Sequence, residues 1–591
     1  MLVPASIVGL IVFIYGLATM STDPTSNEIC GKDGDLIMCP QCDELCTYWR
    51  LNTSCLYSRV TYTVDNPATI FFTIFMALWA TFFMEFWKRQ QARIQYDWDV
   101  ADYEEAEQSM RPEFQANAQN KKKNPITHDY EPYMTMWERG LRIMSSLMFI
   151  FFLLLVVLAA ILAIIIYRIF VVVLIYNSPD QLIKSQASLI TTVTAACLSV
   201  IVITLLNKVY EKIAVFLTDR EMWKYQTEWE DSFTVKMYLF QFANYYGTIF
   251  YIAFIKGRMQ GSPLHYTKLA GRRLEECDPS GCLTELAIQL AIVMVGKQAL
   301  NNFKEIVIPI LVKLFKSRKG RKKIETDDDK YTSWERDYDL VDFPVHGLYE
   351  EYLEMVIQYG FVTLFVAAFP LAPFFALLNN IIEVRLDATK MITQWKRPMA
   401  DRAQDIGTWF VILQAISKMA VLINAGIIAF TSDFIQKSMY EYTDVKQDTG
   451  QSYIEWSLST FRTSDFDNES MPIPAFENAT FGDTIYANHV CRYRDFRNNP
   501  NSSTWDDSDP STQYVLTKTY WHVLTARLAF ILVFEHLVLG IAELINFLVP
   551  DVPIDVRDRT LREKFLAKVS LHERIKHQKE SDSAEVVGTT F

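Results

Sequence analysis

Apolar residues along this chain occur in long blocks separated by polar segments. The segment from Leu147 to Ile166, for example, contains no charged residue. A helix needs about 20 apolar residues to cross the hydrocarbon core of a bilayer, which is about 30 Å thick. Ten stretches are long enough: 2–20, 67–87, 143–176, 187–206, 234–256, 283–315, 344–369, 371–393, 408–430 and 518–548. The pattern predicts an all-α polytopic membrane protein with ten transmembrane helices.

Basic residues follow the second and sixth apolar stretches. Lys88, Arg89 and Arg93 come after the second, and residues 316–323 after the sixth hold six basic residues out of eight. Because Lys and Arg favour cytosolic loops, both loops are predicted to be cytosolic. The run 316–323 is either a solvated topogenic loop or a binding site for anionic lipid.

This orientation divides the chain into a first transmembrane helix, an external Cys-rich loop, helices two to nine, an external loop, a tenth helix and a cytosolic tail. The corresponding ranges are 1–20, 21–66, 67–430, 431–517, 518–548 and 549–591. The loop 258–282 is also predicted to be external.

Glycosylation signals and cysteines agree with this topology. The four Asn-x-Ser/Thr sites fall in loops predicted to be external: Asn52, Asn468, Asn478 and Asn501. Eight of the nine cysteines do so too: Cys30, Cys39, Cys42, Cys46, Cys55, Cys277, Cys282 and Cys491. We expect disulfides, although eight thiols allow about 105 pairings and the sequence selects none. Cys39 and Cys42 have the spacing of a zinc ligand pair, but an oxidising compartment favours disulfides.

Composition and charge exclude several function classes. Half of the residues (50%) are hydrophobic, and the net charge of −12 argues against a nucleic-acid partner, which would require a basic face. The chain has no Walker-type loop, His-Glu-x-x-His or Gly-x-Ser-x-Gly motif. We therefore expect no enzyme activity.

Acidic residues inside three consecutive predicted spans are the strongest chemical signal. A charge in the bilayer interior costs at least about 2.5–3.5 kcal/mol, so each one needs a reason. Spans six, seven and eight run antiparallel and bring five carboxylates and at least one amide to a common depth near the cytosol. These residues are Asn301, Glu305, Glu351, Glu354, Glu383 and Asp387. Their i,i+3 and i,i+4 spacings place each set on one helical face.

Such a cluster must bind a cation, take up protons or form ion pairs. Hard oxygen ligands on flexible helices suit calcium, which takes about 6–8 oxygens. By charge balance we expect two calcium ions. Ion pairs with Lys297, Lys304 or Arg385, or a proton relay, remain the alternatives. Since an empty site repels its helices and a filled one draws them together, a bendable helix could convert binding into gating. Gly296 and Pro309 are the candidate hinges of span six.

Long motifs in the chain resemble the anoctamin family from residue 1 to about residue 560. They include Asn301-x-x-x-Glu305, Glu351-Tyr-Leu-Glu354-Met, Phe369-Pro-Leu-Ala-Pro373, Asn379-Asn-Ile-Ile-Glu383-Val-Arg-Leu-Asp387, Met38-Cys-Pro-Gln-Cys42, Asp65-Asn-Pro-Ala-Thr69, Phe75-Met-Ala-Leu-Trp79, Glu85-Phe-Trp-Lys-Arg89 and Glu276-Cys-Asp-Pro-Ser-Gly-Cys282. The resemblance implies a ten-span homodimer with one groove per subunit, lined by spans three to seven and opened by cytosolic calcium.

The resemblance also implies individual residue roles. The six residues of the acidic cluster would hold two calcium ions, with Asn379 as an additional ligand. Glu85 and Asp551 match a weaker calcium site between spans two and ten, although Asn546 stands where an acid is expected. The groove residues would be Arg168, Gln241, Asn244 and Tyr245. Arg168 would guide anions or lipid headgroups, or else merely extend its side chain to the interface.

Some anoctamins are chloride channels and others are phospholipid scramblases that leak ions. Gln241 stands where the channels carry a pore lysine, so the chain is more similar to the scramblases. We expect phospholipids and small ions as transported species, in the plasma membrane or an internal secretory-pathway membrane. The rival hypotheses are a calcium-activated chloride channel and an inactive tether or scaffold.

The resemblance implies a cytosolic domain ahead of the first span. This sequence begins at Met1, next to the first apolar block. We therefore expect a short isoform, a partial gene model or a fragment.

Overall fold

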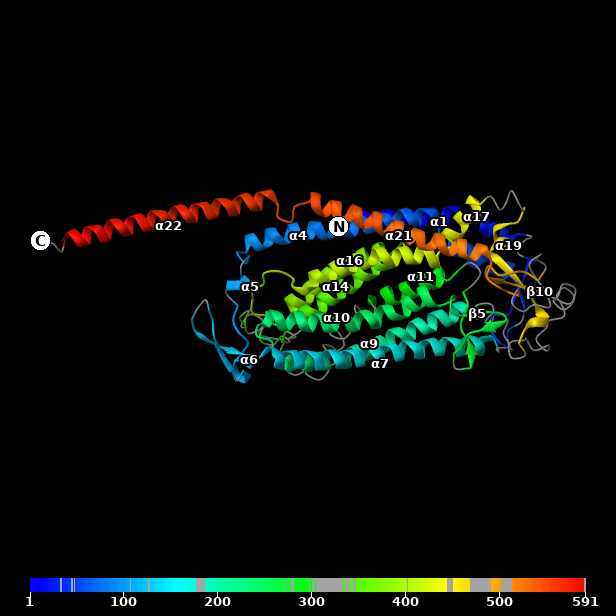
Figure 1. Ribbon diagram of the computed structural model, residues 1–591, viewed down its shortest axis with the longest axis horizontal. Coiled ribbons are helices and arrows are strands. Elements are labelled where there is room, and N and C mark those ends of the chain that lie inside the picture. The colour runs from blue at the N-terminus through cyan, green and yellow to red at the C-terminus, as the bar shows by residue number, and fades with distance from the viewer. Residues whose placement is uncertain are drawn as a thin grey trace.

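The protein is a long bundle of near-parallel helices with a small sheet at one end and a single helix projecting from the other (Figure 1). This computed structural model describes residues 1–31, 35–43, 46, 48–101, 103–106, 108–118, 120–125, 128–176, 187–269, 271–277, 281–296, 298–299, 303, 332, 334, 338, 340, 342–343, 347–400, 402–443, 450–467, 490–500 and 513–588.

The bundle consists of the helices that the apolar stretches predict. Their bounds are α1 Leu2–Thr19, α4 Pro67–Asp97, α7 Met136–Tyr176, α9 Ala187–Glu221, α10 Gln226–Phe250, α11 Leu283–Ala291, α14 Gly347–Leu364, α15 Ala372–Thr389, α16 Thr408–Gly426 and α21 Lys518–Leu548. Within the described part of the chain, six helices are long and apolar enough to cross a membrane; they contain α1, α4, α7, α9, α16 and α21. The chain is therefore a multi-pass membrane protein.

Two of the less apolar bundle helices carry the acidic residues noted above. α14 and α15 are 18 residues long, and each contains three charged residues. Charge lowers their mean hydropathy, yet both are packed inside the bundle, where Phe365 and Ala376 are fully buried. Burial against protein, not lipid, is how a membrane protein accommodates such helices.

Four bundle helices end in a π-helical turn. These turns are η3 Tyr251–Ile255, η4 Ile292–Gly296, η5 Lys390–Gln394 and η6 Ile427–Thr431. A π turn holds one residue more than an α turn and often occurs at functional positions. The turns η4 and η5 lie next to the acidic cluster described below.

The external end is built from the two long loops. Strands β1 Ile37–Met38, β2 Trp49–Arg50, β9 Leu458–Arg462 and β10 Val490–Arg494 form one sheet in the order β2-β1-β10-β9. β1 pairs in parallel with β10, so residues far apart in sequence lie side by side. Small elements surround the sheet: α2 Pro24–Cys30, η2 Leu51–Ser54, α3 Cys55–Tyr62, α17 Phe434–Tyr442, α19 Tyr453–Ser457 and η7 Thr463–Asp465, with the short strands β5 Gly261–Ser262, β6 His265–Tyr266, β7 Lys268–Leu269 and β8 Arg272–Arg273.

All eight cysteines predicted to be external form disulfides. The bonds are Cys30–Cys55, Cys39–Cys491, Cys42–Cys46 and Cys277–Cys282. Cys39 and Cys42 thus bond to different cysteines, and these disulfides exclude the alternative in which the two thiols bind zinc. The disulfide prediction is confirmed, and the structure supplies the pairing that the sequence left open.

The opposite end carries the segments predicted to be cytosolic. They are α5 Tyr103–Ala106, α6 Pro112–Asn117, the hairpin of β3 Asn120–Lys123 and β4 Tyr130–Tyr133, and α22 Ile554–Gly588. The tail helix α22 extends well beyond the bundle (Figure 1). The sheet predicted to be external and the basic segment after the second span therefore lie at opposite ends of the described structure.

The bundle core is aromatic and closely packed. Phe72 on α4, Tyr246 on α10 and Phe365, directly after α14, are completely buried. α1 packs against α15, and Gly9 allows this approach because a Cβ there would lie 2.3 Å from the Pro370 carbonyl oxygen. α1 thereby supports the helix that carries part of the candidate site.

Candidate functional site

Three carboxylates meet between α14 and α15. Glu351 and Glu354, one turn apart on α14, face Glu383 on α15, and one oxygen of each lies within 4.8 Å of the others. Glu383 is only 2% exposed, and the two α14 side chains are half-buried. The i,i+3 spacing and the antiparallel arrangement predicted this convergence, and the structure confirms it for these three residues.

A fourth side chain, Gln298, reaches this cluster from span six. Its amide nitrogen donates a hydrogen bond to Glu354 and a second one, 3.1 Å long, to Glu383. Gln298 was not among the residues predicted from the sequence. The available signal was its position, one turn before Asn301 and two turns before Glu305 on the same predicted helix face. Asn301 and Glu305 themselves lie outside the described residues.

Asp387 lies one turn beyond Glu383 and is held by a lysine. The ammonium of Lys390 lies 3.0 Å from the Asp387 carboxylate and 2.9 Å from that of Glu351. Lys390 is 7% exposed and opens the π turn η5. The alternative ion pairs predicted from the sequence used Lys297, Lys304 or Arg385. The structure instead pairs these acids with Lys390.

Asn379 lies one turn before Glu383 and bonds to its neighbouring helix. Its amide nitrogen donates to the Gln358 side chain over 3.0 Å, and Gln358 donates to Asn380 over 2.5 Å. This amide ladder fixes α14 against α15 above the carboxylates. It therefore helps to position the cluster.

The donor set fits calcium. Calcium–oxygen distances are about 2.3–2.6 Å, so two oxygens on opposite sides of one ion lie about 5 Å apart. The mutual distances within the cluster stay below that limit. The donors are hard carboxylate oxygens, and a rotated Gln298 amide would add another. The described part of the site thus suits a divalent cation.

Gly296 ends the π turn η4, two residues before Gln298. Among the described residues, a Cβ at Gly296 would meet only Ile292, at an ordinary contact distance of 3.9 Å. The described packing therefore leaves room for a side chain at this position, and the hinge role of Gly296 stays a prediction. The second predicted hinge, Pro309, and the basic run 316–323 lie outside the described residues.

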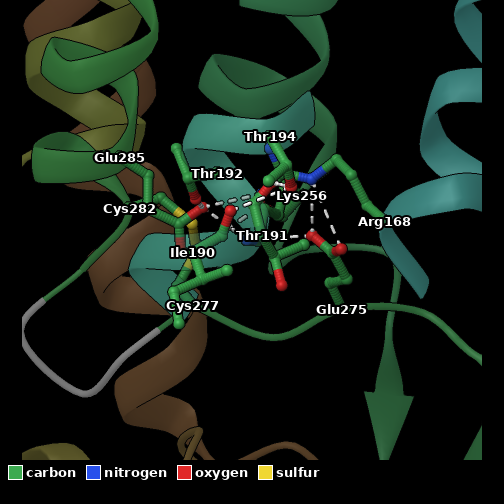
Figure 2. A network of polar contacts seen from close by, with 10 residues as sticks. All are labelled: Arg168, Ile190, Thr191, Thr192, Thr194, Lys256, Glu275, Cys277, Cys282 and Glu285. Atoms are coloured by element: carbon green, nitrogen blue, oxygen red, sulfur yellow. Dashed lines mark hydrogen bonds and ion pairs between the residues drawn. A yellow bond between two sulfur atoms is a disulfide. The ribbon is translucent and has the colours of Figure 1, made fainter. Parts of the chain in front are cut away.

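A second charged cluster joins α7, the segment after η3, the 258–282 loop and α11 (Figure 2). Arg168 from α7 pairs with Glu275 at 3.1 Å and with Glu285 on α11 at 3.0 Å. Lys256, directly after η3, lies 2.9 Å from Glu275 and 2.5 Å from Glu285. Two cations thus share two acids, and all four side chains are at most 8% exposed.

Neighbouring cations keep the Glu275 carboxylate ionised. Burial raises the pKa of the Glu275 carboxyl, but Lys256 and Arg168 outweigh burial and hold the pKa below its ordinary value of 4.5. Glu275 therefore keeps its negative charge across the physiological pH range. Arg168 does not extend to solvent as the alternative reading proposed, because it is buried and paired with two acids.

Polar groups on α9 and α10 bond to one another and to their own helices. Asn244 donates to Asn207 over 2.8 Å, and Asn207 donates to the Tyr245 hydroxyl over 3.2 Å. The Oε1 atom of Gln241 is buried and has no hydrogen-bond partner among the described residues. Thr194 bonds back to its own helix, whereas Thr192 lies 3.5 Å from Glu285. α9 also contacts α11 and η4, so spans four and six touch.

The predicted secondary site contains a lysine. The Lys88 ammonium lies 2.8 Å from the Glu85 carboxylate, 3.2 Å from that of Asp551 and 3.2 Å from the side-chain amide oxygen of Asn546. The structure brings the two predicted acids together from α4 and the segment after α21. A metal ion there would have to displace the ammonium of Lys88.

Of the glycosylation signals, only Asn52 lies among the described residues. Its side-chain nitrogen lies 3.3 Å from Asp35 at the external end. Asn468, Asn478 and Asn501 lie outside the described residues.

Comparisons with known proteins identify the family. A family model described as "Anoctamin: Calcium-activated chloride channel" matches residues 1–563. The chain is 47% identical to Anoctamin-4 of Mus musculus over 584 residues, which are 97% of this chain and 60% of that protein. It is 45% identical to Anoctamin-3 of Homo sapiens over 575 residues, or 97% of this chain and 57% of that one. Anoctamin-5 of Homo sapiens is 43% identical over 590 residues, with shares of 97% and 62%.

The chain thus spans about 60% of the length of the curated relatives it matches. The matched region contains both charged clusters and every described groove residue. The chain belongs to the anoctamin family.

Proposed function

We propose that the protein is a calcium-activated phospholipid scramblase that also conducts ions without strong selectivity. The observation that carries this proposal is the meeting of Glu351, Glu354 and Glu383 with Gln298 from span six. This arrangement links a cation site to span six, which contacts α9 through α11 and η4.

The carboxylates provide the driving force for gating. Buried like charges within 4.8 Å repel one another and favour separation of α14, α15 and span six. Bound calcium would supply the positive charge that reverses this repulsion. Gln298 then transmits the change to span six, and the π turn at Gly296 absorbs the bend. In the same scheme Asn301 and Glu305 complete a site for two calcium ions.

The polar residues on α9 and α10 near Gln241 favour lipid transport over selective anion transport. Gln241 is neutral and buried, and Asn207, Asn244 and Tyr245 provide polar groups along the neighbouring helices. Zwitterionic headgroups need such groups to cross the bilayer interior, whereas anion selectivity requires a fixed positive charge. We further propose ten spans, a homodimer with one groove per subunit, and location in the plasma membrane or an internal secretory-pathway membrane.

Dithionite quenching of fluorescent phospholipid in proteoliposomes tests the proposal. With the full chain and calcium, quenching should exceed the share of label in the outer leaflet, and it should return to that share without calcium. Glu354→Gln should abolish the calcium response. Quenching confined to the outer leaflet at every calcium concentration would contradict a scramblase.

A calcium-activated chloride channel is the second candidate, because that description belongs to the matching family model. In the scramblase reading, Gln241→Lys adds a positive charge to the groove and should raise the chloride-to-sodium permeability ratio, measured from reversal potentials. The control is Gln226→Lys, which adds the same charge at an exposed position of α10 and should leave the permeability ratio unchanged. Gln289 cannot serve as the control position, because its side chain is buried. A strongly chloride-selective wild type without lipid transport would favour the channel.

A third hypothesis is an inactive tether or scaffold. It predicts that Glu354→Gln and Asp387→Asn leave every transport signal unchanged. The burial of Glu383 beside two further carboxylates argues against this hypothesis, since a scaffold does not need such a site.

A further inference from the structure

Lys390 places a positive charge inside the acidic cluster. Its ammonium lies 2.9 Å from Glu351 on α14 and 3.0 Å from Asp387 on α15. The side chain of Lys390 is 9% exposed, so solvent screens these two contacts only in part. The lysine thus joins the two helices through two carboxylates expected to bind calcium.

Lys390 also has a second contact a short distance from the carboxylates. Its ammonium lies 5.3 Å from the ring centroid of Trp395, within the range of a cation–π interaction. Trp395 is fixed in turn, because its backbone nitrogen donates to the Lys390 carbonyl oxygen over 3.1 Å and its ring packs edge-on against Phe343. The π turn η5 between the two residues brings the ring under the lysine.

An ammonium and a divalent cation compete for the same carboxylate oxygens. A carboxylate that ligates calcium directly cannot keep a full ion pair, because the two cations repel each other at such short distances. Lys390 therefore has to move when Glu351 and Asp387 become ligands. The Trp395 ring face is a nearby position at which the ammonium keeps a favourable contact.

We propose that Lys390 is a tethered counter-cation of the calcium site, which neutralises Glu351 and Asp387 before calcium binds and withdraws from them as calcium binds. This inference rests on the proposed function, since it assumes that the cluster binds calcium. Its consequence is a lower calcium affinity than the carboxylates alone would give. Lys390 thus sets the calcium concentration at which the protein responds.

A purely structural ion pair predicts the opposite effect. If Lys390 only held the carboxylates in place, its removal would leave them disordered and would weaken calcium binding. Competition instead predicts tighter binding once the lysine is gone. The sign of the change therefore separates the two roles.

Calcium titration of the purified full chain, with the binding heat measured by calorimetry, tests the proposal without a transport assay. Lys390→Met removes the charge and keeps most of the length, and it should tighten calcium binding about tenfold, which equals about 1.4 kcal/mol. Lys390→Arg keeps the charge and should stay within about threefold of wild type. Lys396→Met is the matched control, because Lys396 lies 2.8 Å from Asp342, which is not part of the acidic cluster. This variant should leave the calcium affinity unchanged.

Unchanged or weaker calcium binding in Lys390→Met would overturn the proposed competition. Calcium binding in Lys390→Arg that is as tight as in Lys390→Met would overturn it too. Thermal unfolding of each variant verifies that it is folded. Glu354→Gln separates this failure from failure of the proposed function. If wild type binds calcium and Glu354→Gln does not, a negative Lys390 result concerns Lys390 alone. If wild type binds no calcium, both proposals fall.

Discussion

Buried cations in the bundle are held by carboxylates from neighbouring elements. Lys236 lies 2.7 Å from Glu221, and Lys256 lies 2.5 Å from Glu285. A buried ion pair need not stabilise the fold relative to apolar residues, but removal of one partner leaves an uncompensated charge. Single substitutions in these pairs should therefore have large effects.

Lys256→Gln should destabilise the protein by about 3 kcal/mol, because Glu275 and Glu285 lose one of their two cations. The external ends of spans three, five and six should then separate more easily. Thermal unfolding measures the loss of stability, and dithionite quenching without calcium measures the expected increase in leak. Lys268→Gln is the control, because Lys268 is exposed in the same external loop. Equal unfolding temperatures for the two variants would contradict the role of Lys256.

The sequence predicted individual acids better than it predicted their partners. Spacing along one helix placed Glu351 and Glu354 on one face, and the structure confirms their meeting with Glu383. Gln298 and Lys390 were missed because their contacts depend on the rotation of each helix about its own axis. Periodicity within a single helix does not determine that rotation between helices.

At the scale of elements, the helix boundaries show which part of each helix the hydropathy pattern predicts. The stretch predicted over 518–548 matches α21 in full, whereas the stretch predicted from 143 begins at Met136 in α7. Hydropathy detects the part of a helix inside the bilayer, while backbone hydrogen bonds continue the helix into water. The π turns were not predicted, because no residue type marks them.

The Cys277–Cys282 disulfide anchors the external end of span six. Cys282 immediately precedes α11, and Glu275 and Glu285 flank the bonded pair. Replacement of both cysteines by serine should cost about 2 kcal/mol, as the chain-entropy model gives for so short a loop. The same double variant should raise calcium-free lipid leak by loosening the Arg168–Lys256 cluster.

Serine replacement of Cys30 and Cys55 provides the comparison. This disulfide joins residues 25 apart and does not flank Glu275 or Glu285, so its loss should reduce stability at least as much without any change in leak. An equal leak in both double variants would show that general destabilisation, and not the anchor at span six, opens the path.

At the scale of the whole molecule, the two charged clusters share one span, span six. The acidic cluster lies toward the end that carries α5, α6 and α22, and the Arg168–Lys256 cluster lies next to the external sheet (Figure 1). Span six takes part in both, through Gln298 and Glu285. A movement of span six at the cytosolic end is therefore opposed by ion pairs at the external end.

The multi-pass class was predictable because a helix that crosses a membrane needs a long apolar block. The cysteines predicted to be external agree with the orientation predicted from Lys88 and its neighbours, and all eight of them form disulfides. The pairing itself was not predictable, since β1 and β10 meet across more than 400 residues: Cys39 and Cys491 are 452 residues apart.

The calcium dependence of lipid scrambling in Glu383→Gln tests the central claim most directly, because Glu383 is the most buried carboxylate of the cluster. The control is Glu350→Gln, whose acid is exposed at the start of α14. We predict that Glu383→Gln raises the calcium concentration for half-maximal scrambling by at least about tenfold, while Glu350→Gln stays within about twofold of wild type. Identical calcium responses in wild type and Glu383→Gln would contradict a gating site between α14 and α15.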